Sequence, residues 1–278
     1  MREQPYAGRM DKWSRLDRLV ARVTGEDPIA FLDATTTQDL TGLAKGDSVL
    51  TCMLDEKGRV QAEMRVTLAE DGWVLIDAEQ PARDAITGWL AKIAPLSGCE
   101  VIDESDRWNV VALFGASSAP PGAIPLVSDW GPSDLEVLIS SSVGVKGHEI
   151  GEAGYEAARI ASGRPLFGVD FDESTHIAET PLITRAVSFT KGCYPGQESV
   201  ARVSNLGKVR KRLVGLQIAG NVVPEPGTPL TVEGQEVGRI TSATAWEGRA
   251  FAIGPLRSDV HEGATVEAGD AAAIVRAL

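Results

Sequence analysis

The chain has 278 residues, of which 43% are hydrophobic and 24% charged, and its formal net charge is −12. This size and composition predict a folded protein of roughly two domains with a large core, and they argue against disorder. A surface this acidic repels phosphate groups, so neither nucleic acid nor an anionic membrane is expected as a partner. The sequence contains no run of about 18 apolar residues and its N-terminus has no apolar targeting core, which predicts a cytoplasmic protein.

The three cysteines, Cys52, Cys99 and Cys193, are widely spaced and form no C-x-x-C pair. None of the three histidines lies at the spacing of a zinc ligand from any of them. We therefore expect neither a disulfide framework nor a zinc site, and we expect reduced thiols.

The first half of the chain predicts an antiparallel sheet with a helix on one face. Alternating apolar residues and glycine-containing turns indicate strands, whereas a proline start followed by apolar residues at helical spacing indicates a helix. In the strand over 59–68, Val60, Ala62, Met64 and Val66 share one face. In chain order, the expected elements are a short helix ending in a polar loop over 31–40, strands over 48–54, 59–68 and 72–78, and a helix over 80–93.

The second half repeats this theme and then changes character. Strands are expected over 108–115 and 134–141, followed by a helix over 151–163 that ends at Gly163 and an ordered loop over 164–183. From residue 213 onward, short apolar runs alternate with glycine and proline turns, which is typical of a small β-barrel. The predicted fold class is therefore α+β, with one region over 1–208 and the barrel over 209–278.

Residues 191–198 read KGCYPGQE and follow the alternating stretch VSF. We expect an extended strand with Val187, Phe189, Lys191 and Cys193 on one side, where the ammonium of Lys191 would favour the thiolate form of Cys193. Pro195 and Gly196 suit the two central positions of a type II turn, and Glu198 would lie near a helix start.

A cysteine that merely fills a gap in the core is the alternative for each thiol. Cys52, within an apolar strand, and Cys99, in a turn, are predicted to be of that kind. The glycines, the lysine and the GQE turn around Cys193 favour a functional thiol instead.

The octapeptide closely resembles the K-G-C-[FY]-x-G-Q-E signature of the YgfZ family, folate-binding proteins that maintain iron–sulfur enzymes and are related to the glycine-cleavage T-protein. Four further segments resemble parts of the same family in the same order, namely 22–40, 54–60, 158–171 and 179–182. The resemblance implies three lobes around a central opening that binds tetrahydrofolate, with a C-terminal β-barrel as one lobe.

The resemblance also suggests roles for individual residues. In the T-protein an acidic residue after a G-x-x-x-x-G segment contacts the pterin, and here Asp170 follows Gly163–Gly168 at that place. Gly196, Gln197 and Glu198 would shape the loop around the thiol. The basic run 208–212 is either a solvated linker or an anion site for the folate glutamate tail, with Arg202 as a helper.

One departure from the T-protein concerns its pair of aspartates, the first of which assists methylene transfer. Alignment places Ala62 at the first aspartate and Glu63 at the second. Because alanine neither accepts a proton nor stabilises a cation, the aminomethyltransferase reaction is not expected.

Three functions remain in competition. The first is a tetrahydrofolate-binding accessory protein that uses Cys193 to support the assembly or repair of iron–sulfur client enzymes through transient contact, since a single thiol is too few to hold a cluster. The second is a folate-dependent aminomethyl- or methyltransferase, for which Glu63 is the only nearby base, although alternation along the strand points it away from the side of Ala62. The third is a scaffold with an empty pocket.

Overall fold

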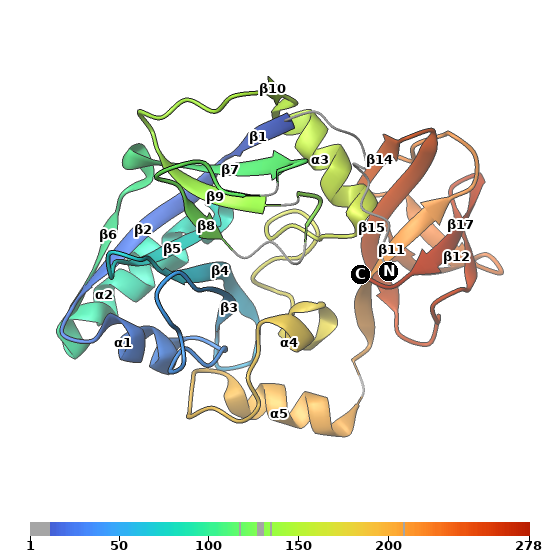
Figure 1. Ribbon diagram of the computed structural model, residues 1–278. Helices are drawn as coiled ribbons and strands as arrows, with labels where there is room; N and C mark the ends of the chain where they lie inside the picture. Colours follow the sequence, from blue (N-terminus) through green and yellow to red (C-terminus); the bar gives the residue numbers. More distant parts are fainter. Residues whose placement is uncertain (1–11, 117, 127–130, 134, 208) are drawn as a thin grey trace.

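The computed structural model describes residues 12–116, 118–126, 131–133, 135–207 and 209–278. Its strands form three sheets, and the helices α1, α3, α4 and α5 lie around and between them (Figure 1). The predicted α+β class is confirmed. The helices are α1 Pro28–Thr35, α2 Ala91–Ile93, α3 Gly151–Ser162, α4 Leu182–Arg185 and α5 Gln197–Leu206.

The first sheet has five strands in the order β3-β4-β5-β2-β6, paired antiparallel. One face is apolar, because Val60, Ala62, Met64 and Val66 of β4 are all fully buried in the largest core cluster, as alternation predicted. The strands are β2 Arg18–Gly25, β3 Ser48–Leu54, β4 Val60–Leu68, β5 Val74–Glu79 and β6 Cys99–Asp103.

A composite helical segment over 80–97 covers that apolar face with Ile86 and Leu90, and α1 contributes Phe31 and Leu32. The single helix predicted over 80–93 is in fact four short pieces of different pitch. They are η1 Gln80–Ala82, the π-helical η2 Asp84–Leu90, α2 and η3 Ala94–Ser97.

The second sheet also has five strands, in the order β10-β1-β7-β9-β8. Val110 and Phe114 of β7 share a core cluster with Val20 and Leu75 of the first sheet, so this sheet covers the opposite face of the first one. Its strands are β1 Lys12–Leu16, β7 Trp108–Phe114, β8 Ile124–Leu126, β9 Leu135–Ser140 and β10 His148–Glu149.

The third sheet closes on itself, because β11 pairs with both β15 and β17. The ring runs β11-β17-β16-β12-β13-β15, and β14 pairs with β15 outside it, so the predicted C-terminal barrel is confirmed. The expected boundary residue, Lys208, lies outside the described residues, and the boundary stays a prediction. The strands are β11 Lys211–Ile218, β12 Pro229–Val232, β13 Gln235–Arg239, β14 Ser242–Trp246, β15 Arg249–Arg257, β16 Thr265–Ala268 and β17 Ala271–Arg276.

One helix end and one loop follow the sequence closely. Gly163 ends α3 in the left-handed conformation at φ 81°, as predicted. The segment over 164–183 is mostly irregular, containing only η5 Ile177–Glu179 and the start of α4. No helix among the described residues combines the length and the apolar character needed to cross a membrane.

The predicted strand over 187–193 is wrong. These residues form an irregular loop with bends, and only Ser188 donates a backbone hydrogen bond to the segment beside it, at Thr37 O (2.9 Å). The Ser188 hydroxyl instead accepts from the backbone amides of Thr190 and Lys191, at 3.4 and 3.2 Å. This local turn of a serine side chain competes with strand pairing, and the alternating pattern did not reveal it.

Candidate functional site

Residues 187–196, which we call the signature loop, carry the cysteine of the octapeptide at the surface. Cys193 is exposed and free, whereas Cys52 and Cys99 are buried, as their sequence context predicted. Phe189, four residues earlier, is 54% exposed, which is unusual for a large aromatic side chain. The loop therefore presents a thiol and a phenyl ring to solvent.

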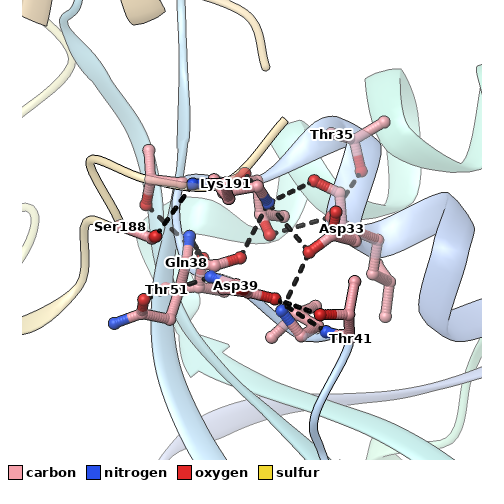
Figure 2. Close-up of polar contacts among 12 residues, drawn as sticks. Asp33, Thr35, Gln38, Asp39, Thr41, Thr51, Ser188 and Lys191 are labelled. Atoms are coloured by element: carbon pink, nitrogen blue, oxygen red, sulfur yellow. Dashed lines mark hydrogen bonds and ion pairs between the residues drawn. The ribbon is translucent and has the colours of Figure 1, made fainter. Parts of the chain in front are cut away.

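Lys191 points into the protein, with a side chain only 2% exposed (Figure 2). Its Nζ donates to three backbone carbonyls just past or within α1, those of Asp33 (2.5 Å), Thr36 (3.0 Å) and Gln38 (2.8 Å), and to Oδ1 of Asp33 at 3.0 Å. The ring of Tyr194 lies 5.8 Å from the same nitrogen. The common strand face expected for Lys191 and Cys193 does not exist, and the electrostatic role of the lysine stays a prediction.

The sequence predicts that the polar loop after α1 ends a short helix. The hydroxyls of Thr35 and Thr36 bond back to carbonyls of α1, as in a helix-terminal loop. Thr37 differs, because its hydroxyl donates to Ala186 O next to the signature loop and accepts from the backbone amide of Cys52. One of the three threonines thus supports the loop directly.

The predicted turn at Pro195–Gly196 is present. The amide of Gln197 donates to Tyr194 O at 3.3 Å, and Gly196 has φ 83°, the left-handed value that a type II turn requires. A Cβ at Gly196 would lie 2.5 Å from the carbonyl oxygen of Asp55, in the β3–β4 hairpin. The glycine is therefore required both by its conformation and by close packing on that hairpin.

α5 begins at Gln197, directly after this turn. Glu198 lies in its first turn and pairs with Arg202 at 3.0 Å, with side chains 91% and 66% exposed respectively. Both side chains face solvent, so any contact with a folate tail stays a prediction. Lys191, Cys193 and the start of α5 are thus close neighbours along one continuous segment.

Asp170 lies elsewhere, in the connection between α3 and the barrel. Its Oδ2 accepts from Arg159 Nη1 (2.8 Å) and from the backbone amide of Leu166 (2.9 Å). Its Oδ1 accepts from the hydroxyls of Thr241 and Ser242, each at 2.6 Å. A carboxylate offers about four acceptor positions, so the protein already fills those of Asp170. A pterin at this carboxylate would have to displace some of these bonds.

The side of β4 opposite Ala62 is also buried, but it is charged. Arg65 pairs with Asp77 of β5 (2.6 Å) and with Glu136 of β9, and Arg164 pairs with Glu136 at 3.2 Å. Burial raises the pKa of Glu136, yet Arg65 and Arg164 outweigh it and hold that pKa at about 2. With Glu63, these residues form the inter-sheet cluster: Glu63, Arg65, Asp77, Glu136 and Arg164.

Glu63 is a member of this cluster that lacks a full set of hydrogen-bond partners. It is 2% exposed, and its Oε1 has no hydrogen-bond partner among the described residues. Burial raises the pKa of Glu63, against the lowering effect of Arg164 and Arg18. Arg164 has an unpartnered buried atom of its own, Nε. Such orphaned buried groups call for a water, an ion or a ligand.

Two residues that sequence reasoning did not assign to the site, Tyr194 and Cys52, are buried in the main core cluster. Burial raises the pKa of Tyr194, and Cys52 raises it further. Burial likewise raises the pKa of Cys52, and the carboxylate of Glu63, which lies opposite it on β4, acts in the same direction.

The parity of β4 corrects one step of the sequence argument. Ala62 and Glu63 do point to opposite sides, but Ala62 is in the apolar core and Glu63 faces the second sheet. The face of β4 that is turned toward the second sheet therefore carries a carboxylate, that of Glu63. The signal was available in the alternation itself, since Glu63, Arg65 and Thr67 form a polar set on an inner strand.

Comparisons with known proteins agree with this architecture. Residues 18–120 match the model of the GCVT N-terminal domain, and residues 210–277 match that of the CAF17 C-terminal beta-barrel domain. The chain is 24% identical to the tRNA-modifying protein YgfZ of Cronobacter sakazakii, over 89% of this chain and 84% of that protein. It is 25% identical to an aminomethyltransferase of Thermosynechococcus vestitus, over 87% and 74% of the two chains.

Among solved structures, the aminomethyltransferase T of the glycine cleavage system from Bartonella henselae superposes with a TM-score of 0.82 at 17% identity. The match covers 97% of this chain and 86% of that one, so the three-part fold is that of the T-protein. Together with the octapeptide, these similarities confirm the expected relationship: the chain combines a GCVT N-terminal domain with a CAF17-type C-terminal barrel and is similar over most of its length to YgfZ proteins and to aminomethyltransferases.

Proposed function

We propose that this protein binds tetrahydrofolate and supports the assembly or repair of iron–sulfur enzymes, with Cys193 as the functional thiol. The observation that carries the proposal is the exposed Cys193 on a loop that several hydrogen bonds fix to α1 and to the residues after it. An inert structural cysteine is normally buried, and Cys193 is not.

The residues between the two sheets fit a reduced pterin. A pterin ring offers N–H donors and ring acceptors on adjoining edges, so it requires both an acceptor and a donor from the protein. Glu63 Oε1 and Arg164 Nε supply one of each and have no other partners among the described residues. We therefore place the pterin contact at Glu63 in preference to Asp170, whose acceptor positions are filled. When bound, tetrahydrofolate would supply one-carbon chemistry.

Client enzymes would meet Cys193 transiently. The part of the chain that the structure describes contains no group of three His, Cys, Asp or Glu side chains arranged for a metal ion. One exposed thiol is a suitable nucleophile or temporary ligand, whereas stable clusters usually have about four ligands.

The test replaces Cys193 by Ala in a strain that lacks its own copy of the gene and measures the activity of several iron–sulfur enzymes. We expect activities close to those of the strain without the protein. The matched control is Cys99→Ala, which removes a buried thiol far from the loop in sequence and should restore activity. Full rescue by Cys193→Ala would defeat the thiol mechanism.

A second candidate function is favoured by the orientation of Glu63. A folate-dependent aminomethyl- or methyltransferase needs a base, and Glu63 is a buried carboxylate with a raised pKa on the side of β4 that faces the second sheet. A steady-state transfer assay with tetrahydrofolate and an aminomethyl donor separates the two functions. Turnover that Glu63→Gln abolishes would favour the transferase.

Direct binding of nucleic acid is not part of the proposal. The name of the YgfZ relatives refers to tRNA modification, but the net charge of −12 opposes contact with a phosphate backbone. We expect no binding of bulk tRNA at physiological salt in a filter or mobility-shift assay.

A further inference from the structure

We propose that Lys191 is a positioning residue: its ammonium holds the signature loop on the C-terminal end of α1, and it serves Cys193 through this attachment and not through its charge. The functional part of this inference rests on the function proposed above, whereas the attachment itself concerns the protein alone.

The ammonium of Lys191 has more acceptors around it than it has N–H donors. A lysine has three N–H donors, and four oxygens lie within 3.0 Å of Nζ, three of them backbone carbonyls. No donor is left over for a thiolate or for a bound ligand. The side chain is 2% exposed, so its long stem is fixed as well.

Those acceptors lie at the C-terminal end of α1. The last carbonyls of an α-helix have no partner within the helix and carry a partial negative charge. α1 ends at Thr35, and the carbonyls of Asp33, Thr36 and Gln38 surround this end (Figure 2). Within α1 no basic residue lies in the last turn. Lys191, about 155 residues further along the chain, supplies that cation instead.

The charge of the Lys191 ammonium is balanced by that of Asp33. Asp33 accepts from Nζ at 3.0 Å, and its Oδ1 also accepts from the backbone amide of Leu40 at 2.8 Å. The positive charge is therefore paired with a carboxylate inside the protein. A paired, buried charge exerts a much weaker field on a surface group than a free one does.

Further contacts show what the lysine fixes. Ser188 N donates to Thr37 O, Thr37 Oγ1 donates to Ala186 O, and Gln38 Nε2 donates to Arg185 O. All of them join the loop after α1 to residues 185–188. The hydrogen bonds of the Lys191 ammonium attach the signature loop to the same region a few residues further along. Without them, the loop between Ser188 and the buried Tyr194 would lose its attachment to α1, and Cys193 would be held only from the side of Tyr194 and Gly196.

The test compares the free, full-length protein with Lys191→Met and Lys191→Arg. Lys45→Met, which removes a positive charge from an exposed loop, is the matched control. Two quantities are measured in each: the hydrogen-exchange rate of the Ser188 and Lys191 amides, and the pH midpoint of Cys193 alkylation. For Lys191→Met we expect exchange to be faster by about tenfold or more, because a charge-assisted set of bonds is lost. We expect the alkylation midpoint to stay where it is in the unmodified protein and in the control.

Lys191→Arg distinguishes the two roles further. It keeps the charge, but a planar guanidinium does not fit a cage of four oxygens built for a compact ammonium. Positioning predicts faster exchange in this variant too, whereas an electrostatic role predicts unchanged behaviour. Unchanged exchange in Lys191→Met, or a shift of its alkylation midpoint, would overturn the proposal.

Should Lys191→Met fail to fold, Asp33→Asn gives the same decision. It leaves the ammonium in place and removes the compensating charge. Under the positioning role exchange at Ser188 is faster, because the ammonium loses its charged acceptor. Unchanged exchange at Ser188 in Asp33→Asn would overturn the proposal. These measurements use neither folate nor client enzymes, so they hold even where Cys193→Ala shows the proposed function to be wrong.

Discussion

Two buried polar regions of this protein differ in how many of their polar atoms have hydrogen-bond partners. The first is the barrel joint, formed by Arg159, Asp170, Thr241 and Ser242, where both carboxylate oxygens of Asp170 accept two bonds each. The second is the inter-sheet cluster, where Glu63 Oε1 and Arg164 Nε have no partner among the described residues. Buried polar groups in proteins are almost always hydrogen-bonded. A saturated region is therefore structural, and one with orphaned atoms is the better candidate for a ligand.

The barrel joint connects parts that are distant in the sequence. Arg159 lies on α3 and is completely buried, and Ser242 begins β14, the strand outside the barrel ring. Arg159 also donates to the carbonyl of Arg164 at 2.6 Å. Asp170 thus links α3, the loop after it and the barrel, which explains an acidic residue at this place without a ligand.

The largest effect that we expect is on the barrel joint. Asp170→Ala removes the fully buried one of the two carboxylates that pair with the guanidinium of Arg159, the other being the partly exposed Glu156. Breaking a buried pair in this way costs about 3–5 kcal/mol. We expect a loss of that order in the free energy of unfolding, measured by urea denaturation. Asp270→Ala, at an exposed turn before β17, is the control and should change little.

Folate measurements sharpen the same comparison. If the joint is purely structural, Asp170→Asn should bind tetrahydrofolate as the unmodified protein does wherever it is folded. A selective loss of folate binding in a stable Asp170→Asn protein would restore the role predicted for this residue from the sequence.

A smaller effect is expected at the inter-sheet cluster. Glu63→Gln keeps the shape of the side chain but replaces part of its acceptor capacity by N–H donors that oppose those of a pterin. We expect tetrahydrofolate to bind about tenfold more weakly or worse, since a hydrogen bond to a charged group is lost. Isothermal calorimetry measures this directly.

The control for that experiment is Glu100→Gln, on the exposed side of β6 in the same sheet. Equal folate affinity in Glu63→Gln and in the control would show that the orphaned oxygen does not receive the ligand. The inter-sheet cluster would then resemble the barrel joint in function, and the distinction between the two regions would fail.

The sequence predicted the fold better than it predicted the site. The strands of the first sheet, the end of α3 at Gly163 and the barrel all follow from alternation and from glycine and proline turns, which act over a few residues. The helix expected over 80–93 is present, but its division into pieces of different pitch was not predicted, and the loop over 187–196 was predicted wrongly as a strand because tertiary contacts decide it. In the loop, one serine hydroxyl and the end of a distant helix replace the pairing that a strand would need.

Within the site, the sequence predicted which residue carries the thiol, but it did not predict the partners of the charged side chains. The octapeptide singled out Cys193, and the structure shows it exposed. The sequence placed Lys191 on one strand face with that thiol, which the loop conformation contradicts, because spacing cannot show which long-range partners a charged side chain has. The pterin role of Asp170 stays a prediction. Glu63 was discounted for facing away from Ala62, whereas it is Ala62 that lies in the apolar core.

The smallest effect that we expect is on the pH dependence of stability in Glu63→Gln, compared with the loss of stability in Asp170→Ala. Burial raises the pKa of Glu63 above its ordinary value, so the native state holds this proton more tightly than the unfolded chain does. The contribution of Glu63 to stability is therefore complete below its ordinary pKa and is lost as the pH rises through the raised value. Glu63→Gln removes this dependence, and its stability relative to the unmodified protein should improve between pH 4 and pH 8, by less than the loss in Asp170→Ala. Urea unfolding at both pH values measures the difference. A relative stability that worsens with pH would mean that Arg164 and Arg18 favour the charged form of Glu63, in which case the cluster needs no ligand to balance it.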